Sequence, residues 1–356
     1  MELAALYLPQ FHSIPENDEW WGPGFTEWTN VQRAQPLFRG HYQPVIPGEL
    51  GYYDLLNPDV RERQAELART HGVTSFCYWH YWFGGRRLLE RPFDEVLSSG
   101  SPDFPFFLGW ANQSWSGVWH GDPGRILMAQ EYPPEDDQRH FDHLLTAFRD
   151  ERYVRIDGRP VLLVFCPLDL PNPRAFVERW QAMAQSAGLG GLYLVAWLEG
   201  REWGVNYVTH DADGFDAGLY VHFPFHRTVT SRIRERARVR HERFGPTRYP
   251  YAHDLPPPVV DVAGVVHPSV QPNWDNTPRS QRRGAVALDS SPARFQRQLT
   301  QALTQVLAAP PQRQLCVIKS WNEWAEGNYL EPDDRYGHGW LEAVRNARRT
   351  VGAHAD

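Results

Sequence analysis

Short runs of apolar residues alternate with amphipathic segments along most of the chain. We expect strands at eight of these runs, residues 3–9, 73–83, 104–115, 159–167, 192–200, 215–223, 264–276 and 315–324. Most of the runs are almost continuously apolar, which is typical of parallel strands that are covered on both faces. Segments with helical periodicity follow most of them, among them residues 60–72, which end at a glycine that can stop a helix.

The alternation of strands and helices indicates βαβ units, and eight such units predict a closed (β/α)8 barrel, the TIM barrel. A doubly wound open sheet is the alternative. That fold should carry a glycine-rich phosphate turn after its first strand, whereas this chain has PQFHSIPENDEWW there. We expect residues 1–356 to form one domain with long loops at the C-terminal face of the barrel. Residues 226–260 are rich in Arg, His and Pro, and we expect them to be an insertion between strands six and seven.

Charge and hydropathy narrow the range of partners. The chain of 356 residues has a net charge of −7, which disfavours nucleic acid because phosphate binding needs a basic surface. No apolar run approaches the ~18–20 residues of a membrane span, and the N-terminus lacks the pattern of a signal peptide. A cytoplasmic location is therefore the default expectation. The three cysteines have no metal-ligand spacing, and we expect neither a metal nor another cofactor. The sequence leaves the oligomeric state open.

Aromatic residues are unusually frequent, with 15 tryptophans and 13% aromatic residues overall. They can pack in the core, or they can form platforms for the apolar faces of sugar rings. In a barrel the active site lies at the C-terminal ends of the strands, and almost every one of these ends carries Trp, Tyr, His, Asn or Glu in this chain. An oligo- or polysaccharide is therefore the expected ligand. The candidate substrate-binding residues are Tyr7, Gln10, His12, Glu27, Trp28, Tyr78, His80, Tyr81, Trp82, Trp110, Asn112, Trp115, Trp197, Tyr220, Trp274, Trp321, Asn322 and Trp324.

Two carboxylates follow the last expected strand in the segment SWNEWAEGNYLEP, residues 320–332. Glycoside hydrolysis needs one protonated acid and one carboxylate that acts as base or nucleophile. Glu323 and Glu326 are three residues apart among indoles, and burial beside an indole would raise the pKa of one of them. The structural alternative is that Glu326 caps a turn while Glu323 pairs with an arginine. Because of their place at the end of a barrel strand, we predict that Glu323 and Glu326 form the catalytic pair.

Several long segments resemble one known family. They are YLPQFHSIPENDEWWGPGFTEWTNV (7–31), GHYQPVIPGELGYYDL (40–55), FCYWHYWFGGRRLLERPFDEVL (76–97), WANQSW (110–115) and SWNEWAEGNYLEPDDRYGHGWLEA (320–343). They are similar to the WbsX-type family, also described as the glycoside hydrolase family 99-like domain. That family occurs in bacterial polysaccharide loci and was first named as a glycosyltransferase family. The resemblance covers nearly the whole chain and implies a (β/α)8 barrel.

The related family 99 enzymes are retaining endo-α-mannosidases and mannanases whose active motif, N-E-W-x-E-G, is similar to residues 322–327 here. The resemblance implies that Glu323 deprotonates the 2-hydroxyl of the sugar itself, which then forms a 1,2-anhydro sugar. It implies that Glu326 protonates the departing oxygen, and that no metal is needed. The chain has Ala325 where the classical family has His, and Gln113 where WbsX relatives usually have Glu. These departures leave the sugar specificity open. The expected activity is endo-acting, retaining hydrolysis of an α-linked, mannan- or O-antigen-like bacterial polysaccharide.

Two other functions compete with hydrolysis. A retaining glycosyltransferase of surface polysaccharide synthesis would have to hold a nucleotide diphosphate, usually through a D-x-D-bound metal or a basic cluster. Asp211-Ala212-Asp213 fits that tripeptide formally. A non-catalytic glycan-binding barrel is the other, and it predicts that replacement of Glu326 leaves every measurable property intact.

Overall fold

Eight parallel strands form the centre of the protein. The computed structural model describes residues 1–117, 122–199, 210–221, 245–251 and 264–353. The barrel strands are β1 (Glu2–Tyr7), β2 (Ser75–Phe83), β4 (Phe106–Trp110), β8 (Arg159–Val164), β9 (Tyr193–Glu199), β10 (Ala217–Val221), β12 (Val265–Val270) and β14 (Leu315–Ile318). Each pairs with the next in this order, and β14 pairs with β1 to close the ring. The predicted (β/α)8 barrel is confirmed, with a strand that overlaps each of the eight expected apolar runs.

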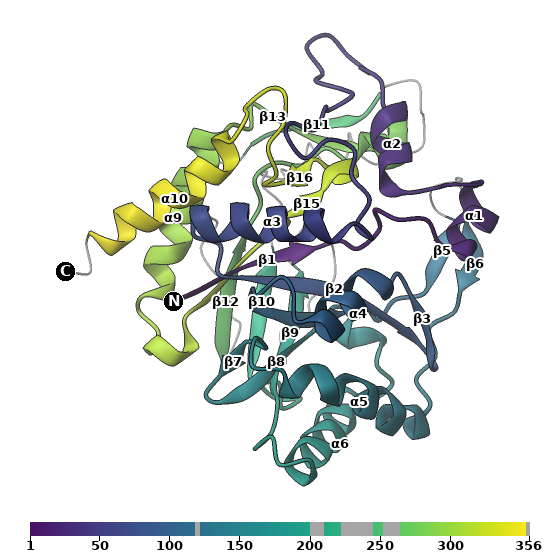
Figure 1. Ribbon diagram of the computed structural model, residues 1–356, viewed down its shortest axis with the longest axis vertical. Coiled ribbons are helices and arrows are strands. Elements are labelled where there is room, and N and C mark those ends of the chain that lie inside the picture. The colour runs from purple at the N-terminus through teal and green to yellow at the C-terminus, as the bar shows by residue number, and fades with distance from the viewer. Residues whose placement is uncertain (118–121, 200–209, 222–244, 252–263, 354–356) are drawn as a thin grey trace.

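Helices follow six of these strands in the described ranges and cover the outside of the barrel (Figure 1). They are α3 (Pro58–His71), α4 (Arg91–Ser99), α5 (Pro134–Arg149), α6 (Pro173–Ser186), α9 (Pro292–Val306) and α10 (Gly339–Gly352). The boundaries of α3 illustrate why the sequence folds this way. The Asn57 side chain accepts from the Asp59 N–H at its start, and Gly72 ends it in the left-handed conformation with a φ of 90°.

Shorter elements lie beyond the C-terminal ends of the strands. In Figure 1, β1 runs from left to right, and α1 (Pro15–Trp21) and the hairpin of β5 (Trp115–Gly117) and β6 (Asp122–Met128) lie at the right. The other elements that build this face are α2 (Glu27–Arg33), α8 (Thr277–Ser280), the 3-10 turn η5 (Gln281–Arg283), β15 (Asn322–Glu323), the 3-10 turn η7 (Trp324–Glu326) and β16 (Asn328–Tyr329). A two-stranded parallel sheet of β11 (Thr247–Pro250) and β13 (Ala285–Leu288) adjoins them. The remaining short elements are β3 (Arg86–Leu88), β7 (Arg155–Ile156), η2 (Pro167–Asp169) and η6 (Pro311–Arg313).

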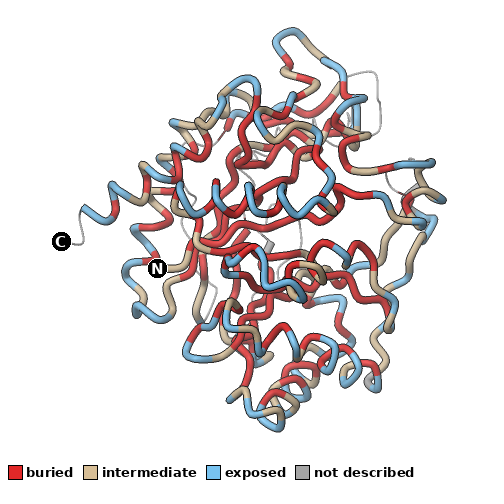
Figure 2. Tube along the Cα trace, viewed as in Figure 1, coloured by how far each residue is buried: buried red, intermediate tan, exposed pale blue. Residues whose placement is uncertain are grey.

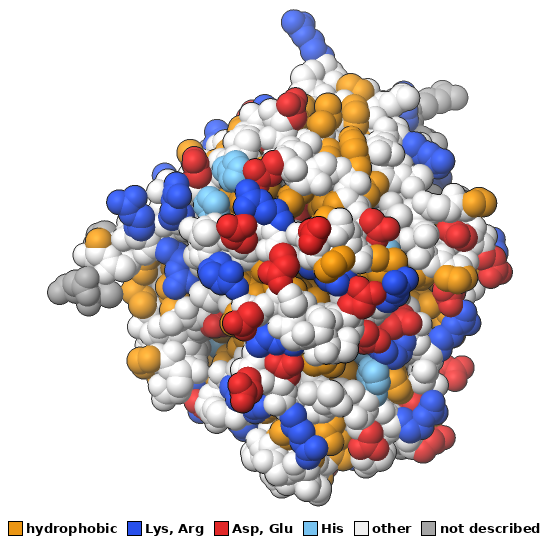
Figure 3. All heavy atoms as spheres, viewed as in Figure 1, with side chains coloured by type: hydrophobic (Ala, Val, Ile, Leu, Met, Phe, Trp, Pro, Cys, Tyr) orange, Lys and Arg blue, Asp and Glu red, His pale blue; other side chains and the backbone are white. Residues whose placement is uncertain are grey.

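The expected insertion at residues 226–260 lies largely outside the described residues. Of that range the structure describes residues 245–251, which include β11. Of the helices in the described ranges, none has both the length and the apolar character that crossing a bilayer requires. On the face shown in Figure 3, basic and acidic side chains are interspersed.

The barrel strands are the most deeply buried part of the chain, whereas the covering helices alternate between buried and exposed turns (Figure 2). On β2 the two faces divide by parity. Tyr78 packs on the outside, against Phe93 of α4, whereas Trp79 packs inside the barrel, against Phe165 and Trp197. Successive strand residues point to opposite sides of a sheet, so a shift of one residue decides whether a side chain faces a helix or the barrel interior.

A buried carboxylate ties the last hairpin to the rest of the barrel. Glu331 is fully buried and accepts four hydrogen bonds, from the Tyr53 hydroxyl (2.9 Å), the Gln64 amide (2.6 Å), and the indole N–H groups of Trp321 (3.0 Å) and Trp324 (2.6 Å). Its two oxygens can accept all four, since an ionised carboxylate has about four acceptor positions. Burial raises the pKa of Glu331 to about 7, and the four donors oppose that rise. Glu331 thereby fixes the segment that carries Glu323 and Glu326.

We predict that Glu331→Gln destabilises the protein by about 2–6 kcal/mol. The amide N–H2 of glutamine cannot accept, so two donors lose their partner, and each unsatisfied buried group costs about 1–3 kcal/mol. Urea unfolding followed by tryptophan fluorescence measures the loss. Glu342→Gln is the matched control because the Glu342 side chain is 55% exposed. Equal stability of the two variants would contradict a structural role for Glu331.

The pH dependence of stability provides a second readout. Because the pKa of Glu331 is raised from 4.5 to about 7, the folded state binds this proton more tightly than the unfolded state. The corresponding stabilisation is complete below the ordinary pKa and is lost as the pH rises through about 7. We expect this decline to be weaker in Glu331→Gln than in the wild-type protein and in Glu342→Gln.

Candidate active site

A cavity of about 480 Å³ opens at the C-terminal end of the barrel, within the range of about 300–1,000 Å³ that is usual for ligand sites. Residues from both ends of the sequence and from the middle converge on it. Its lining consists of Leu8, Gln10, Trp21, Trp79, Tyr81, Ala111, Gln113, Ser114, Trp115, Ser116, Leu127, Phe165, Arg279, Lys319, Glu323 and Glu326. Aromatic rings and polar groups therefore face each other across one space, and the polar groups include two carboxylates and two cations.

A short hairpin places the two carboxylates. β15 pairs antiparallel with β16, and η7 connects them. Asn322 attaches the hairpin to the end of β1, because its side chain accepts from the Leu8 N–H (2.8 Å) and donates to the Leu8 carbonyl (3.0 Å). Gly327 closes η7 with a φ of +69°, and a Cβ there would lie 2.8 Å from the Asp275 nitrogen. This close approach allows the Asp275 N–H to donate to the Glu326 carbonyl at 2.7 Å.

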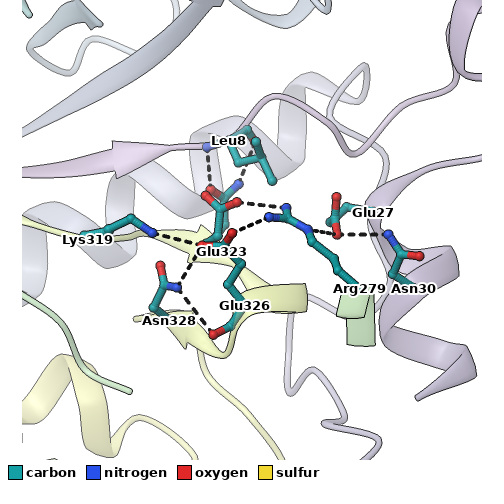
Figure 4. A network of polar contacts seen from close by, with 9 residues as sticks. Leu8, Glu27, Asn30, Arg279, Lys319, Glu323, Glu326 and Asn328 are labelled. Atoms are coloured by element: carbon teal, nitrogen blue, oxygen red, sulfur yellow. Dashed lines mark hydrogen bonds and ion pairs between the residues drawn. The ribbon is translucent and has the colours of Figure 1, made fainter. Parts of the chain in front are cut away.

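One guanidinium binds three carboxylates in this site (Figure 4). Nε of Arg279 lies 2.9 Å from Glu27, Nη2 lies 2.8 Å from Glu323, and Nη1 lies 2.7 Å from Glu326. α8 carries Arg279, and α2 carries Glu27, whose second neighbour in the network is the Asn30 amide at 3.3 Å. The planar fork of arginine suits such multiple contacts, which the single ammonium of lysine could not make.

The two carboxylates that line the cavity differ in their surroundings. Glu326 also accepts from Lys319 Nζ at 2.9 Å and from the Asn328 amide at 3.4 Å. Burial alone would raise the pKa of Glu326, but Lys319 and Arg279 hold it well below its ordinary value. Burial and the negative charge of Glu326 raise the pKa of Glu323, and Arg279 opposes that rise only in part. In the unliganded site Glu326 is thus the ionised member and Glu323 is the member that retains a proton more easily.

This order is the reverse of the one that the resemblance implies, where Glu323 acts as base and Glu326 as acid. The physical reason is the position of Lys319, which contacts Glu326 alone of the two. The opposite pKa shifts do agree with the expectation that two neighbouring carboxylates acquire different proton affinities.

Five of the candidate residues from the sequence line the cavity, namely Gln10, Tyr81, Trp115, Glu323 and Glu326. Glu27 is fully buried and joins them through Arg279. Burial raises the pKa of Tyr81, and the charge of Glu323 adds to this rise, so its hydroxyl stays protonated and can donate. These residues come from four separate segments of the sequence, and the barrel brings them together.

Several strand-end candidates face the covering helices instead of the cavity. His80 lies 2.9 Å from His140 of α5 and Trp82 donates to Asp136 of α5 at 2.6 Å. Tyr7 donates to Gln64 of α3 at 2.6 Å, and Tyr78 packs against Phe93 of α4. Trp110 packs against Phe176 and Trp180 of α6. The expectation that these five residues contact substrate is corrected, because strand alternation turns each of them outward.

Other candidates hold the scaffold. Trp321 and Trp324 are fully buried and donate to Glu331, and Trp28 donates to the Tyr53 carbonyl at 2.8 Å. Their predicted stacking on a sugar is therefore replaced by a structural role. Asn322 binds the Leu8 backbone as described above. Asn112 holds the Cys166 backbone by two hydrogen bonds of 2.7 and 2.8 Å. His12 is buried with Nδ1 3.0 Å from the Pro9 carbonyl.

The last three candidates do not line the cavity. Trp197 is buried behind Trp79 and Phe165, with ring centroids 5.8 and 4.9 Å away. Trp274 is buried with Lys319 Nζ 4.7 Å from the centre of its ring. Tyr220 is buried on β10. Trp197 and Trp274 thus support cavity residues rather than contacting a ligand themselves.

Sequence reasoning missed Arg279, Lys319, Trp79 and Trp21. Trp79 could have been found, because it is two residues from Tyr81 and therefore shares its face of β2. Lys319 directly precedes the segment SWNEWAEGNYLEP, so its position just after β14 could also have been predicted. No local pattern marks Arg279, which is 252 residues from Glu27 and 44 residues from Glu323.

The D-x-D tripeptide is remote from this site. Residues 211–213 precede β10, which begins at Ala217, so they lie at the N-terminal end of the barrel strands. Gly264, just before β12, is their neighbour there. The cavity opens at the opposite end, and Asp211-Ala212-Asp213 therefore cannot serve a ligand in it. Within the described ranges, no three His, Cys, Asp or Glu side chains converge as metal ligands would.

A (β/α)8 barrel with paired carboxylates in a cavity at its C-terminal face defines the architecture of many glycan-active proteins. The chain belongs to the WbsX family, because the family model described as "Glycosyltransferase WbsX" matches residues 3–344. It is 40% identical over 350 residues to the "Uncharacterized protein WxcX" of Xanthomonas campestris pv. campestris, in two strains. The match covers 97% of this chain and 49% of those relatives, so the chain spans about half of their length.

Solved structures agree on the fold. A GH99 endo-alpha-mannosidase from Bacteroides thetaiotaomicron superposes with a TM-score of 0.61 at 13% identity, covering 100% of this chain and 99% of the other. A chain titled "Glycoside hydrolase-like protein" superposes with a TM-score of 0.60 at 15% identity, covering 97% and 93%. Both likenesses establish a shared barrel architecture.

We predict that Arg279→Gln destabilises the protein by roughly 3–5 kcal/mol at pH 7.5, because it leaves buried carboxylates without their shared cation. The loss should be smaller at pH 5. Arg279 lowers the pKa values of both Glu323 and Glu326, so in the variant both carboxyl groups bind protons at higher pH in the folded state. The folded variant therefore gains stability relative to wild type as the pH falls.

Urea unfolding at the two pH values measures this difference. Arg279→Lys is the control, since it keeps one positive charge but has one nitrogen where Arg279 uses three, and we expect a smaller loss at pH 7.5. A loss for Arg279→Gln that is the same at both pH values would show that packing, rather than charge, explains the effect.

Proposed function

We propose that this protein is a glycoside hydrolase that cleaves an α-linked bacterial polysaccharide, mannan- or O-antigen-like, by endo action and with retention of configuration. One observation carries the proposal. Glu323 and Glu326 line the same cavity, and their pKa values are shifted in opposite directions. An acid and a base in one site are what glycosidic cleavage requires, and neither rival function needs that division.

The chemistry proposed for the pair follows from the family resemblance. One carboxylate removes the proton of the 2-hydroxyl, O2 attacks the anomeric carbon, and the bond from that carbon to the leaving oxygen breaks. The other carboxyl group donates its proton to the leaving oxygen. It then takes a proton from water, whose oxygen opens the 1,2-anhydro ring at the anomeric carbon, while the first carboxyl group returns its proton to O2 and restores the 2-hydroxyl. Arg279 and Lys319 contribute positive charge beside both steps, and this chain's residues supply every proton transfer.

The comparisons support the proposal at the level of architecture and family. The name of the B. thetaiotaomicron enzyme, endo-alpha-mannosidase, motivates an α-linked substrate and cleavage within a chain. The description of the family as a glycosyltransferase motivates the rival, in which a nucleotide sugar is the donor. The position of the D-x-D tripeptide at the far end of the barrel removes one argument for that rival. The WxcX relatives are about twice as long as this chain, so any activity of a protein of that length is also only proposed.

We predict that the wild-type protein releases reducing ends from at least one member of a panel of bacterial α-linked mannans and O-antigens. Glu323→Gln and Glu326→Gln should each lower the rate by a factor of at least about 10², the usual contribution of a general acid or base. Glu342→Gln should keep full activity. Unchanged rates in both variants of the pair would refute its catalytic role, and turnover of nucleotide sugars alone would establish the transferase.

The same variants assign the two roles. A glycosyl fluoride needs no acid to help its leaving group depart, so the variant that lacks the acid should keep activity on it. If Glu323→Gln keeps its activity on the fluoride, Glu323 is the acid, in agreement with the pKa order set by Lys319 and Arg279. If Glu326→Gln keeps it, Glu326 is the acid, as the family resemblance implies. The anomer first released, observed by NMR, tests retention directly.

We predict that Trp115→Ala weakens glycan binding by roughly tenfold, because Trp115 lines the cavity and a lost aromatic contact costs about 0.5–1.5 kcal/mol beyond the buried area. Calorimetric titration with the polysaccharide fragment, in a Glu326→Gln background, measures this change. Trp28→Ala is the contrasting variant. It should lower stability by about 3–5 kcal/mol, as for other buried tryptophans, and leave the affinity of the folded protein unchanged. Weaker binding in Trp28→Ala and unchanged binding in Trp115→Ala would show that Trp28, and not Trp115, contacts the glycan.

A further inference from the structure

A second cavity of about 540 Å³ adjoins the candidate active site. It lies between α2 with its following loop, up to Leu37, on one side, and α8 with η5 on the other. Trp21 and Arg279 line both cavities. The two spaces are therefore neighbours across one indole and one guanidinium, and a ligand longer than a single sugar could occupy both.

The charge of this second cavity is one-sided. Arg33, Arg279 and Arg282 line it, and none of the described residues that line it is an Asp or a Glu. Arg33 and Arg282 are exposed, and within the described ranges neither side chain forms a hydrogen bond or an ion pair. The chain as a whole has a net charge of −7, so a cavity that gathers basic side chains departs from the average of the surface. The guanidinium fork matches the two oxygens of a carboxylate or phosphate.

The rest of the wall suits a ring rather than a free ion. Trp21 and Phe25 both line the cavity, with ring centroids 5.9 Å apart. The amides of Asn30 and Gln35 add groups that can donate to and accept from hydroxyls. An aromatic surface, two amides and two arginines form a set of contacts for a sugar that carries an anionic substituent.

We propose that the second cavity binds an anionic group of the substrate, carried by the sugar next to the one held beside Glu323 and Glu326. The inference rests on the proposed function, in which the first cavity holds the sugar that is cleaved. It adds the class of substrate, an acidic glycan. The same anionic chemistry has two sources, the carboxylate of a uronic acid within a polysaccharide and the diphosphate of an activated sugar donor.

Equilibrium binding tests the proposal without relying on turnover. The probes are α-1,4-trigalacturonate, its carboxyl-reduced neutral counterpart, inorganic pyrophosphate and UDP, each titrated calorimetrically at one fixed ionic strength. We expect wild type to bind at least one of the anions about tenfold or more tightly than the neutral trisaccharide, as a charge-assisted hydrogen bond would give. The double variant Arg33→Gln/Arg282→Gln should lose this preference and keep its affinity for the neutral probe.

Arg39→Gln is the matched control. Arg39 is exposed on the same loop, which begins after α2, but does not line the cavity. Its replacement removes one positive charge next to the cavity and should leave anion binding unchanged. Tighter binding of trigalacturonate than of UDP assigns the site to an acidic glycan, and the reverse assigns it to a diphosphate donor. If no anion binds in a manner that depends on Arg33 and Arg282, the proposal is refuted.

The outcomes also separate this inference from the proposed function. If the protein binds anions through Arg33 and Arg282 but releases no reducing ends, the hydrolase proposal is refuted and the anion site is supported. The double variant could instead release reducing ends from neutral polysaccharides as fast as wild type, with no preference for acidic chains in either protein. That result would support the hydrolase and refute the anion site.

Discussion

Closure of the barrel through β1 is the constraint on which the site depends. β1 pairs with β14 on one side and with β2 on the other, so the first strand of the chain lies beside the last. The end of β1 and the hairpin after β14 are consequently adjacent, and Asn322 joins them through two hydrogen bonds to Leu8. Glu331 then fixes the far side of the hairpin with four donors from four different positions. The carboxylates are thus held by a scaffold whose parts are more than 300 residues apart in sequence.

Electrostatics explains why three buried or nearly buried glutamates are tolerated in one place. Three carboxylates surround Arg279, and Lys319 provides a second cation. The negative charge of Glu326 disfavours ionisation of Glu323, which has no hydrogen bond to the second cation. The asymmetry comes from Lys319, which contacts Glu326 but not Glu323. One lysine at the end of β14 therefore separates the proton affinities of two residues that are neighbours in a short turn.

Much of this fold could be predicted from the sequence, because the barrel strands are apolar runs bounded by helix caps and glycines. The candidate site could be predicted only in part. The motif that contains Glu323 and Glu326 is local, and its position after the last strand identifies the face. The orientation of single side chains is not local information. His80 and Tyr81 are adjacent residues whose side chains are both aromatic and polar, yet His80 faces α5 and Tyr81 faces the cavity.

The tryptophans show the same limit more clearly. Trp321 and Trp324 surround the carboxylates in sequence, but their indole N–H groups have a buried acceptor in Glu331, and this partner fixes them in the core. Trp79 and Trp115, which come from other segments, line the cavity instead. In this chain the tryptophans next to the reactive carboxylates in sequence therefore support them, and tryptophans from distant segments line the cavity.

Arg279 connects the two cavities, and this position has a consequence for the chemistry. Its guanidinium is the shared cation of Glu27, Glu323 and Glu326, and it also lines the basic cavity. An anion bound there adds a further negative charge near the same guanidinium and weakens its hold on the carboxylates. Weaker stabilisation of the ionised forms raises the pKa values of Glu323 and Glu326 together. By linkage, the protonation state of the pair and the affinity for an anion in the second cavity affect each other with one coupling free energy, so occupancy of the neighbouring position would bring a proton to the site that needs it.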